Sequence, residues 1–340
     1  MILFSKKSAP TWMFLLVLAA AMLMACNAEV KPDRSTGRTN EILVVTNSKT
    51  MWEGGVGYIV REFFEQPLPG LPQPEPMFHL FNVADEAFNK VFKAQHNILI
   101  IDINQKHAQP MVETGANYWT SPQRVIKIKA PDSASFRKAF EDHKDAFLKA
   151  YNENEIVRTN EQFKMARSVK LKNIVEKKFG FTMQIPGGFQ VAANDNNFMW
   201  LKQSMRKVKQ DVELGIIIHE RPYVDTNAFS ESEILILRDS LTSRFIAGPS
   251  EGSFMVLSKD FIAPVFKRKD DFVTGFAVET RGLWMVHNNF MGGPFISYTF
   301  LDPELNRVIT VDGYVYNPAD IKRNFIRQME AIFHTISFEN

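Results

Sequence analysis

The sequence predicts two domains, an N-terminal, mainly parallel α/β sandwich and a C-terminal α+β domain with an antiparallel sheet and packed helices. In the first half, short apolar runs alternate with helical stripes, an order that gives parallel strands joined by crossover helices. In the second half, many strands follow one another with few helices, which indicates an antiparallel sheet. We place the two domains at residues 41–170 and 171–340.

In the first half, short apolar runs bounded by turn signals predict buried strands. They lie at 41–46, 77–83, 97–103 and 124–129. Amphipathic stripes predict helices at 50–66, starting with a capping box at Thr50, and at 85–95, with Val91 facing inward. Five prolines within 67–76 impose an extended connection between the first helix and the second strand.

A helical segment joins the two halves. It begins at Asp132, and a break is expected at the polar residues 152–154. A second helix then continues to Gly180, a residue that commonly ends helices.

The second half predicts a series of strands separated by turn signals. They lie at 181–189, 198–201, 212–219, 261–266, 272–280, 283–286, 295–301 and 308–316. One helix is expected after the capping box that begins at Ser230. A last amphipathic helix is expected with Asn317 as its N-cap and Pro318 in its first turn.

The start of the chain has the features of an export signal. Lys6 and Lys7 precede an apolar run at 12–22, which is shorter than the about 20 apolar residues that a transmembrane helix needs. Residues 23–26 (Leu-Met-Ala-Cys) then resemble the lipobox of bacterial lipoproteins, although Met24 stands where a smaller residue is usual. In that family the cysteine is acylated and the chain is cut before it. The alternative is an ordinary signal peptide or signal anchor.

The lipobox reading also explains why the chain has a single cysteine, since a lone thiol in an exported protein has no disulfide partner. We therefore expect a signal peptide at 1–25, lipidation at Cys26 and a flexible tether at 26–40. The expected location is the cell envelope, with the lipid in the outer membrane and the protein facing the periplasm. Asn27 favours this membrane, because an aspartate at that position retains such lipoproteins in the inner membrane.

The charge balance excludes some classes of partner. Cleavage removes Lys6 and Lys7, so the 40 basic side chains fall to 38, equal to the 38 acidic ones. A nucleic-acid-binding protein needs a basic face, so we expect no nucleic-acid partner. The absence of any other cysteine means that the fold depends on its core, which is rich in phenylalanine.

Several motifs of the second half resemble a family of uncharacterised bacterial lipoproteins of this length. They are Ile185-Pro-Gly-Gly-Phe189, Phe198-x-Trp200, Gly293–Phe300 and Asp312–Tyr316. That family carries a domain of unknown function and supplies no catalytic residues to transfer. The strand order of the second half is also loosely similar to PsbP-like sandwiches, which bind partners.

Two places in the first domain are candidates for ligand chemistry. Gly54, Gly55 and Gly57 form a glycine-rich turn whose N–H groups could hold a phosphate or carboxylate, although the spacing of a P-loop is missing. Close packing of the helix on the sheet explains the same glycines. Asp102, at the end of a predicted parallel strand, could pair with His107 as acid and base, or could simply cap the strand end.

The most unusual stretch of the second half is 281–294, which gathers aromatic, methionine and amide side chains beside a Gly-Gly-Pro turn. Such side chains are common on partner-binding surfaces. The candidates for partner binding are Trp284, His287, Asn288, Asn289 and Phe290. Alternatively, the stretch is a hairpin whose alternate residues fill the core.

These observations favour a membrane-anchored, non-enzymatic envelope lipoprotein that binds an envelope protein or glycan. The spacing of the histidines predicts no metal site, and no motif predicts a cofactor. The rival hypothesis is an envelope hydrolase or small-ligand-binding enzyme that uses the crevice of the first domain. It requires a pocket in which Asp102 and the glycine turn meet.

Overall fold

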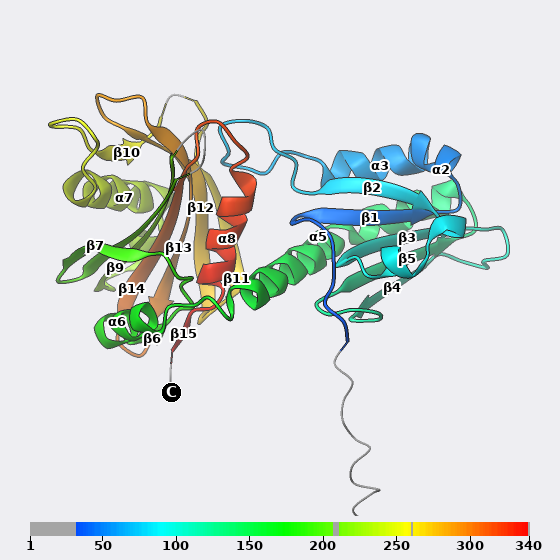
Figure 1. The fold of residues 1–340 in the computed structure, drawn as a ribbon, viewed down its shortest axis with the longest axis horizontal. Helices are drawn as coiled ribbons and strands as arrows, with labels where there is room; N and C mark the ends of the chain where they lie inside the picture. Colours follow the sequence, from blue (N-terminus) through cyan, green and yellow to red (C-terminus); the bar gives the residue numbers. More distant parts are fainter. Residues whose placement is uncertain (1–31, 207–210, 260, 339–340) are drawn as a thin grey trace, which may run out of the picture.

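The computed structural model describes residues 32–206, 211–259 and 261–338, and two large sheets divide this part of the chain (Figure 1). The first half forms a five-stranded sheet in the order β2-β1-β3-β5-β4. The second half forms an eight-stranded antiparallel sheet, in which β10-β12-β13-β14-β9-β8-β7 are successive neighbours and β11 also pairs with β12. The predicted fold class is confirmed.

The first sheet is parallel except at one edge. Its strands are β1 (Glu41–Thr46), β2 (His79–Ala84), β3 (Asn97–Ile103), β4 (Met111–Ala116) and β5 (Arg124–Ala130). Neighbouring pairs among β2, β1, β3 and β5 are parallel, and β4 runs antiparallel to β5. β4 was not predicted, because this edge strand is at most half-buried and has no continuous apolar run.

The helices of the first sheet are shorter than predicted. The expected helix at 50–66 is divided into α2 (Lys49–Glu53) and α3 (Gly55–Phe64), and Ser48 rather than Thr50 caps α2. A Cβ on Gly57 would lie 1.8 Å from the carbonyl oxygen of Trp52, so the close junction of the two helices needs a glycine there.

The expected helix at 85–95 is reduced to a 3₁₀ turn, η1 (Asp85–Ala87), and the single turn α4 (Lys90–Lys93). Val91 is exposed, which corrects the prediction that it faces inward. The apolar spacing of this stretch is real, but two short turns cannot hold all of it against the sheet.

One uninterrupted helix, α5 (Ser133–Phe163), replaces the two that were expected up to residue 163. The predicted break at 152–154 is wrong, because Asn154 and Glu155 are buried and hydrogen-bonded rather than solvated. The chain leaves the helix only after Phe163 and resumes in α6 (Val169–Phe179), which ends at Gly180 as predicted. The predicted domain boundary at 170 therefore lies just inside α6 and stays a prediction.

The second sheet contains long, continuous strands. They are β7 (Gln190–Asp195), β8 (Phe198–Arg206), β9 (Asp211–Pro222), β10 (Met255–Leu257), β11 (Val265–Phe272), β12 (Gly275–Val286), β13 (Gly292–Asp302) and β14 (Arg307–Tyr316). The two strands expected at 272–280 and 283–286 are one strand, β12. β6 (Phe181–Thr182) and β15 (Ser337–Phe338) pair separately.

Helices cover both faces of this sheet. A 3₁₀ turn, η2 (Thr226–Phe229), precedes α7 (Glu231–Phe245), whose cap is Ser230 as predicted. α7 lies over one face of the sheet, and α8 (Arg323–Phe333) packs against β13 and β14 on the other (Figure 1).

α8 begins later than the predicted N-cap Asn317, because its first turn is fixed from the other domain. The Glu75 carboxylate accepts hydrogen bonds from the N–H groups of Lys322 (2.9 Å) and Arg323 (2.8 Å). A negative charge at a helix N-terminus is favourable, and here it joins the two domains. Asn40 also donates to Asn324 across the junction, at 3.1 Å.

Residues 34–40 correct the predicted tether of 26–40. They run along the first domain, where Thr36 donates to Ala94 O (2.8 Å) and Ser35 to Ser121 O (3.2 Å). Polar composition was read as flexibility, but these backbone groups have partners in the domain. Cys26 and the signal peptide lie outside the described residues.

Candidate functional site

A hollow of about 860 Å³ lies between loops of both domains. Volumes of this size are typical of ligand pockets. Its walls come from the β12–β13 hairpin, the segments around Phe261 and Lys322, and the proline-rich connection of the first domain. The unusual stretch 281–294 therefore borders a concavity.

The β12–β13 hairpin is held in a defined shape. Asn288 adopts a left-handed conformation (φ 61°), which asparagine tolerates. Asn289 closes the turn, because its backbone N–H donates to Val286 O and its side-chain oxygen accepts from the N–H of Met291 (both 3.1 Å). Its amide also donates to Ser250. These hydrogen bonds define the backbone of the turn that carries Phe290.

The predicted partner-binding residues separate into three environments. Trp284 is only 2 % exposed, and its indole N–H donates to Val315 O (3.3 Å), so it forms the floor of the hollow and part of the core. Asn288, Asn289 and Phe290 lie on the rim, and the Phe290 ring is fully exposed. His287 stacks on Phe254, with ring centroids 5.0 Å apart, and does not line the hollow.

A second aromatic ring on the rim, that of Phe261, was not among the predicted site residues. Phe261 was expected at the start of a strand, yet the strand begins at Val265 and the ring is 81 % exposed. Its position in a loop could have been read from Pro264, which disfavours the interior of a strand.

The opposite wall was also invisible to the sequence, because it comes from the other domain. Gly70 brings the proline-rich connection onto β12, where a Cβ would lie 2.8 Å from the Cβ of Arg281. This contact places Pro72 and Gln73 beside the hollow. The Lys322 ammonium donates to Gln73 Oε1 (2.9 Å) and ties this wall to the loop that leads into α8.

The hollow is chemically suited to an apolar group. Its floor and rim are mostly Trp, Phe, Met, Leu, Pro and Gly, and its polar groups are amides, one serine and one lysine. The lining contains no carboxylate or histidine. Shape and burial, rather than general acid–base chemistry, are what this site offers.

The first-domain candidates do not assemble into one site. Gly54 and Gly55 border a separate hollow of about 570 Å³ with Ser48 and Arg137. Gly57 serves the junction of α2 and α3, as described above. Asp102 is not among the residues that line that hollow.

Asp102 does contact His107, as predicted. Its Oδ2 lies 3.0 Å from His107 Nε2, while its Oδ1 accepts from the amide of Asn47 at 3.3 Å. Asn47 in turn accepts from the N–H of Ile103. These bonds join the C-terminal ends of the neighbouring strands β1 and β3, so the Asp102–His107 pair has a structural role there.

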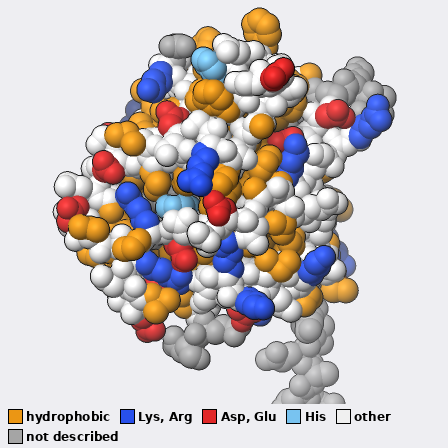
Figure 2. Space-filling model, turned by 90° about the vertical axis from the view of Figure 1, so that its left-hand side faces the viewer, with side chains coloured by type: hydrophobic (Ala, Val, Ile, Leu, Met, Phe, Trp, Pro, Cys, Tyr) orange, Lys and Arg blue, Asp and Glu red, His pale blue; other side chains and the backbone are white. Residues whose placement is uncertain are grey.

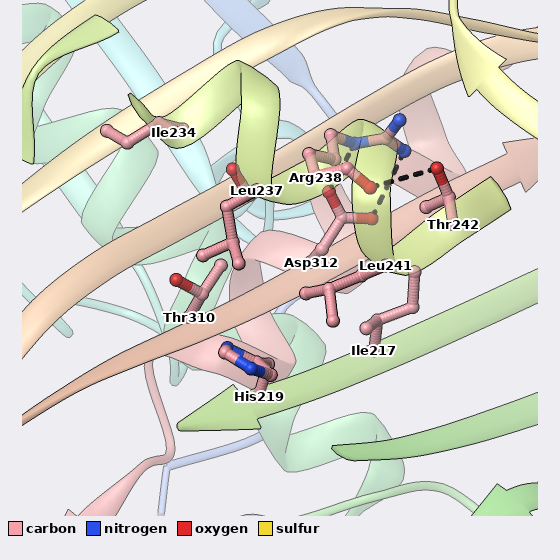
Figure 3. A pocket seen from close by; sticks show the side chains of 10 residues that line it. Ile217, His219, Ile234, Leu237, Arg238, Leu241, Thr242, Thr310 and Asp312 are labelled. Carbon is pink, nitrogen blue, oxygen red and sulfur yellow. Dashed lines mark hydrogen bonds and ion pairs between the residues drawn. The ribbon is translucent and has the colours of Figure 1, made fainter. Parts of the chain in front are cut away.

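A small polar pocket lies beneath α7, where side chains from the helix and from β9, β13 and β14 meet (Figure 3). Arg238 Nε donates to Asp312 Oδ2 (2.8 Å), and the Arg238 guanidinium also lies 3.7 Å from the centre of the Phe295 ring. Burial raises the pKa of the Asp312 carboxyl, and Arg238 partly reverses this effect.

His219 lines the same pocket. Burial, and then the positive charge of Arg221, lower the pKa of His219 to about 4. The free space is about 20 Å³, which is room for roughly one water molecule. This pocket is therefore a buried polar cluster rather than a site for a substrate.

Two further observations limit the chemistry of the described residues. They contain no group of three or more His, Cys, Asp or Glu side chains placed to hold a metal ion. On the face of the C-terminal domain drawn in Figure 2, basic and acidic side chains are interspersed and form no extended patch of one sign.

Fold and site together define a two-domain α/β and α+β protein with an apolar hollow where the domains meet. Residues 35–164 match a domain of unknown function (DUF8532), and residues 167–335 match another (DUF4837). The chain thus belongs to the proteins that carry such domains, and the resemblance seen in the sequence is confirmed to that extent. No curated protein matches the chain.

Two similar solved structures are distant. The crystal structure of the Saccharomyces cerevisiae Ran-binding protein Mog1p is 11% identical, with 47% of this chain and 90% of that chain covered and a TM-score of 0.32. A mutant of protein Mog1 is 12% identical, with 46% and 85% covered and a TM-score of 0.28. Scores this low carry no argument about this chain, and the PsbP-like strand order stays a prediction.

Proposed function

We propose that this protein is a lipid-anchored lipoprotein of the cell envelope that binds a protein partner through the hollow between its domains. The partner inserts an apolar side chain between Phe261 and Phe290. The observation that carries the proposal is the pair of exposed phenylalanine rings on the rim of an apolar hollow. Soluble proteins rarely expose large apolar patches that have no use.

A protein partner suits this rim better than a glycan. Met285 and Met291 line the hollow beside the phenylalanines, and methionine adapts its shape to apolar side chains. The amides of Gln73, Asn288 and Asn289 provide a polar rim, which in protein interfaces surrounds an apolar centre. The lining carries a single charged group, the Lys322 ammonium, which donates to Gln73 Oε1, and it contains no carboxylate.

The anchor is supported by the lipobox-like residues 23–26 and by the lone cysteine. No helix within the described residues is long and apolar enough to cross a membrane. Cells grown with an alkyne fatty acid should label the wild-type protein and not the Cys26→Ser variant. Equal labelling of the two would refute the anchor.

The docking site is tested by Phe261→Ala and Phe290→Ala. Because both rings are exposed, the free energy of unfolding of each variant should lie within about 0.5 kcal/mol of the wild-type value. Loss of a central interface aromatic should weaken binding by about 2 kcal/mol or more. Tyr58→Ala, on α3 and outside the hollow, is the control.

A photoreactive phenylalanine analogue at position 290 in native membranes identifies the occupant. We expect one discrete protein adduct that is lost in the Phe261→Ala background and absent when the analogue stands at position 58. The identified partner, once purified, should bind wild type more tightly than either alanine variant. Adducts only to lipid or glycan, or equal binding by all variants, would refute the proposal.

A further inference from the structure

A second aromatic surface lies on the first domain, far from the hollow in sequence. We call it the Trp119 patch, and it consists of Phe88, Val91, Lys93, Tyr118 and Trp119. The rings of Phe88 and Trp119 meet edge to face at 5.7 Å, and Tyr118 lies 5.8 Å from Trp119. The Lys93 ammonium lies over both Phe88 (5.7 Å) and Trp119 (5.6 Å).

This patch exists because one face of the first sheet is thinly covered. The face toward α3 and α5 belongs to the main core, whereas the other face packs a small cluster around Leu43 and Ile98. Phe88, after η1, and Phe92 of α4 pack against that cluster, and in the described part of the chain Val91, Tyr118 and Trp119 are exposed. Lys90 is exposed beside them, and so are the acids Asp85 and Glu86, so local charge is nearly balanced.

The start of the described chain is fixed beside the same patch. Ser121, two residues after Trp119, donates its N–H to Asp33 O (2.9 Å), and Thr36 donates to Ala94 O at the end of α4. Cys26 lies seven residues before Asp33. An extended residue spans at most about 3.5 Å, so the cysteine stays within roughly 25 Å of this point.

We propose that the Trp119 patch rests in the headgroup region of the membrane to which Cys26 is anchored. This inference depends on the proposed acylation of Cys26. Tyr and Trp favour the membrane–water interface because each combines an apolar ring with a polar group, and a lysine can extend its ammonium to the headgroups. The patch adds a weak second contact to the lipid, and the short chain between them keeps it at the bilayer.

This contact gives the molecule an orientation. The described chain begins on the lower side of the molecule in Figure 1, whereas α8 begins on the upper side, next to the hollow. With the Trp119 patch on the bilayer, the hollow lies away from the membrane and is open to a partner.

The test uses a fluorescent thiol label, because an acylated Cys26 leaves no other cysteine in the chain. The full protein carries Tyr118→Cys. The control is Tyr58→Cys, at an exposed position on α3, which covers the opposite face of the first sheet. Each is labelled with the environment-sensitive dye NBD and reconstituted into vesicles of phosphatidylethanolamine and phosphatidylglycerol (3:1). We expect NBD emission to shift to the blue and to rise at position 118 but not at position 58. Adding Trp119→Ser should return the emission at position 118 toward that at position 58.

The outcomes separate the two proposals. If the chain without an added cysteine takes no label, yet positions 118 and 58 report the same aqueous environment, the anchor stands and the patch proposal is overturned. If Cys26 itself takes the label, the anchor fails and the patch proposal falls with it. Unchanged melting of the Trp119→Ser variant shows that a lost shift reflects lost membrane contact and not unfolding.

Discussion

His219 illustrates how a single residue is set by its surroundings. It points from β9 into the polar pocket beneath α7 (Figure 3). Its Nε2 lies 3.3 Å from the side-chain nitrogen of Asn197. Because its pKa is lowered to about 4 in the folded protein, the ring is neutral there at pH 7. In the unfolded chain a histidine titrates near 6.5.

This difference predicts a loss of stability on mild acidification. Between pH 6.5 and 4 the unfolded chain binds a proton that the folded protein does not, so the free energy of unfolding falls, by about 3 kcal/mol in total from this group. Above pH 6.5 this histidine is neutral in both states and does not make the free energy of unfolding depend on pH. The His219→Gln variant lacks this titration, so it should lose less stability than wild type between pH 7.5 and pH 4.5.

Urea unfolding at several pH values provides the measurement, with the exposed His287→Gln as the control. If wild type and His219→Gln lose stability in parallel from pH 7.5 to 4.5, the buried-histidine account is wrong.

At the scale of an element, α5 shows that polar residues can stabilise the middle of a buried helix. Glu155 Oε1 lies 2.6 Å from His96 Nε2 and accepts from the amide of Asn97 at 2.9 Å. Asn154 donates to the side-chain oxygen of Asn97 and to His96 O. These bonds satisfy groups at the start of β3, so the helix continues where the sequence suggested a break.

α8 contains a network of buried charges. Arg281 of β12 donates to both Glu279 (2.6 Å) and Glu330 (3.1 Å), and Arg327 also donates to Glu330. Burial alone would disfavour the charged Glu330 carboxylate, but the two guanidinium groups hold its pKa well below the usual range. Removing the Glu330 carboxylate would take a partner from both buried guanidinium groups, which is strongly destabilising.

At the scale of the whole molecule, the two domains share a core. One hydrophobic cluster extends from Phe64 and Phe78 of the first domain to Ile326 and Phe333 of α8. Helices α5 and α8 contact each other, and Arg327 lies 6.0 Å from the Phe78 ring. With the Glu75 cap of α8, these contacts make the junction part of the fold rather than a flexible hinge.

We therefore expect the two halves to stay together after the chain is cut between them. A protease site in place of residues 164–167, an exposed connection that includes Met165, should allow complete cleavage with the fragments co-eluting in gel filtration. Glu75→Gln should raise the dissociation constant of the fragments roughly 10-fold, because it removes a charge worth about 1–2 kcal/mol at the α8 N-terminus.

Glu62→Gln, an exposed position on α3, is the control for this experiment. Fragments that separate immediately in the otherwise wild-type chain would contradict the shared core.

The sequence by itself determined the fold class, most strands, the end of α6 at Gly180 and the start of α7 at Ser230, because apolar periodicity and capping residues act over a few neighbouring positions. It also indicated the hairpin around Phe290. Tertiary structure decided which candidate side chains are exposed: Trp284 is buried and Phe290 is not, although both belong to the same apolar stretch. It also decided where α8 begins, through Glu75, and it supplied the second wall of the hollow. The start of α8 and the second wall depend on contacts between residues more than 200 positions apart, which local pattern cannot encode.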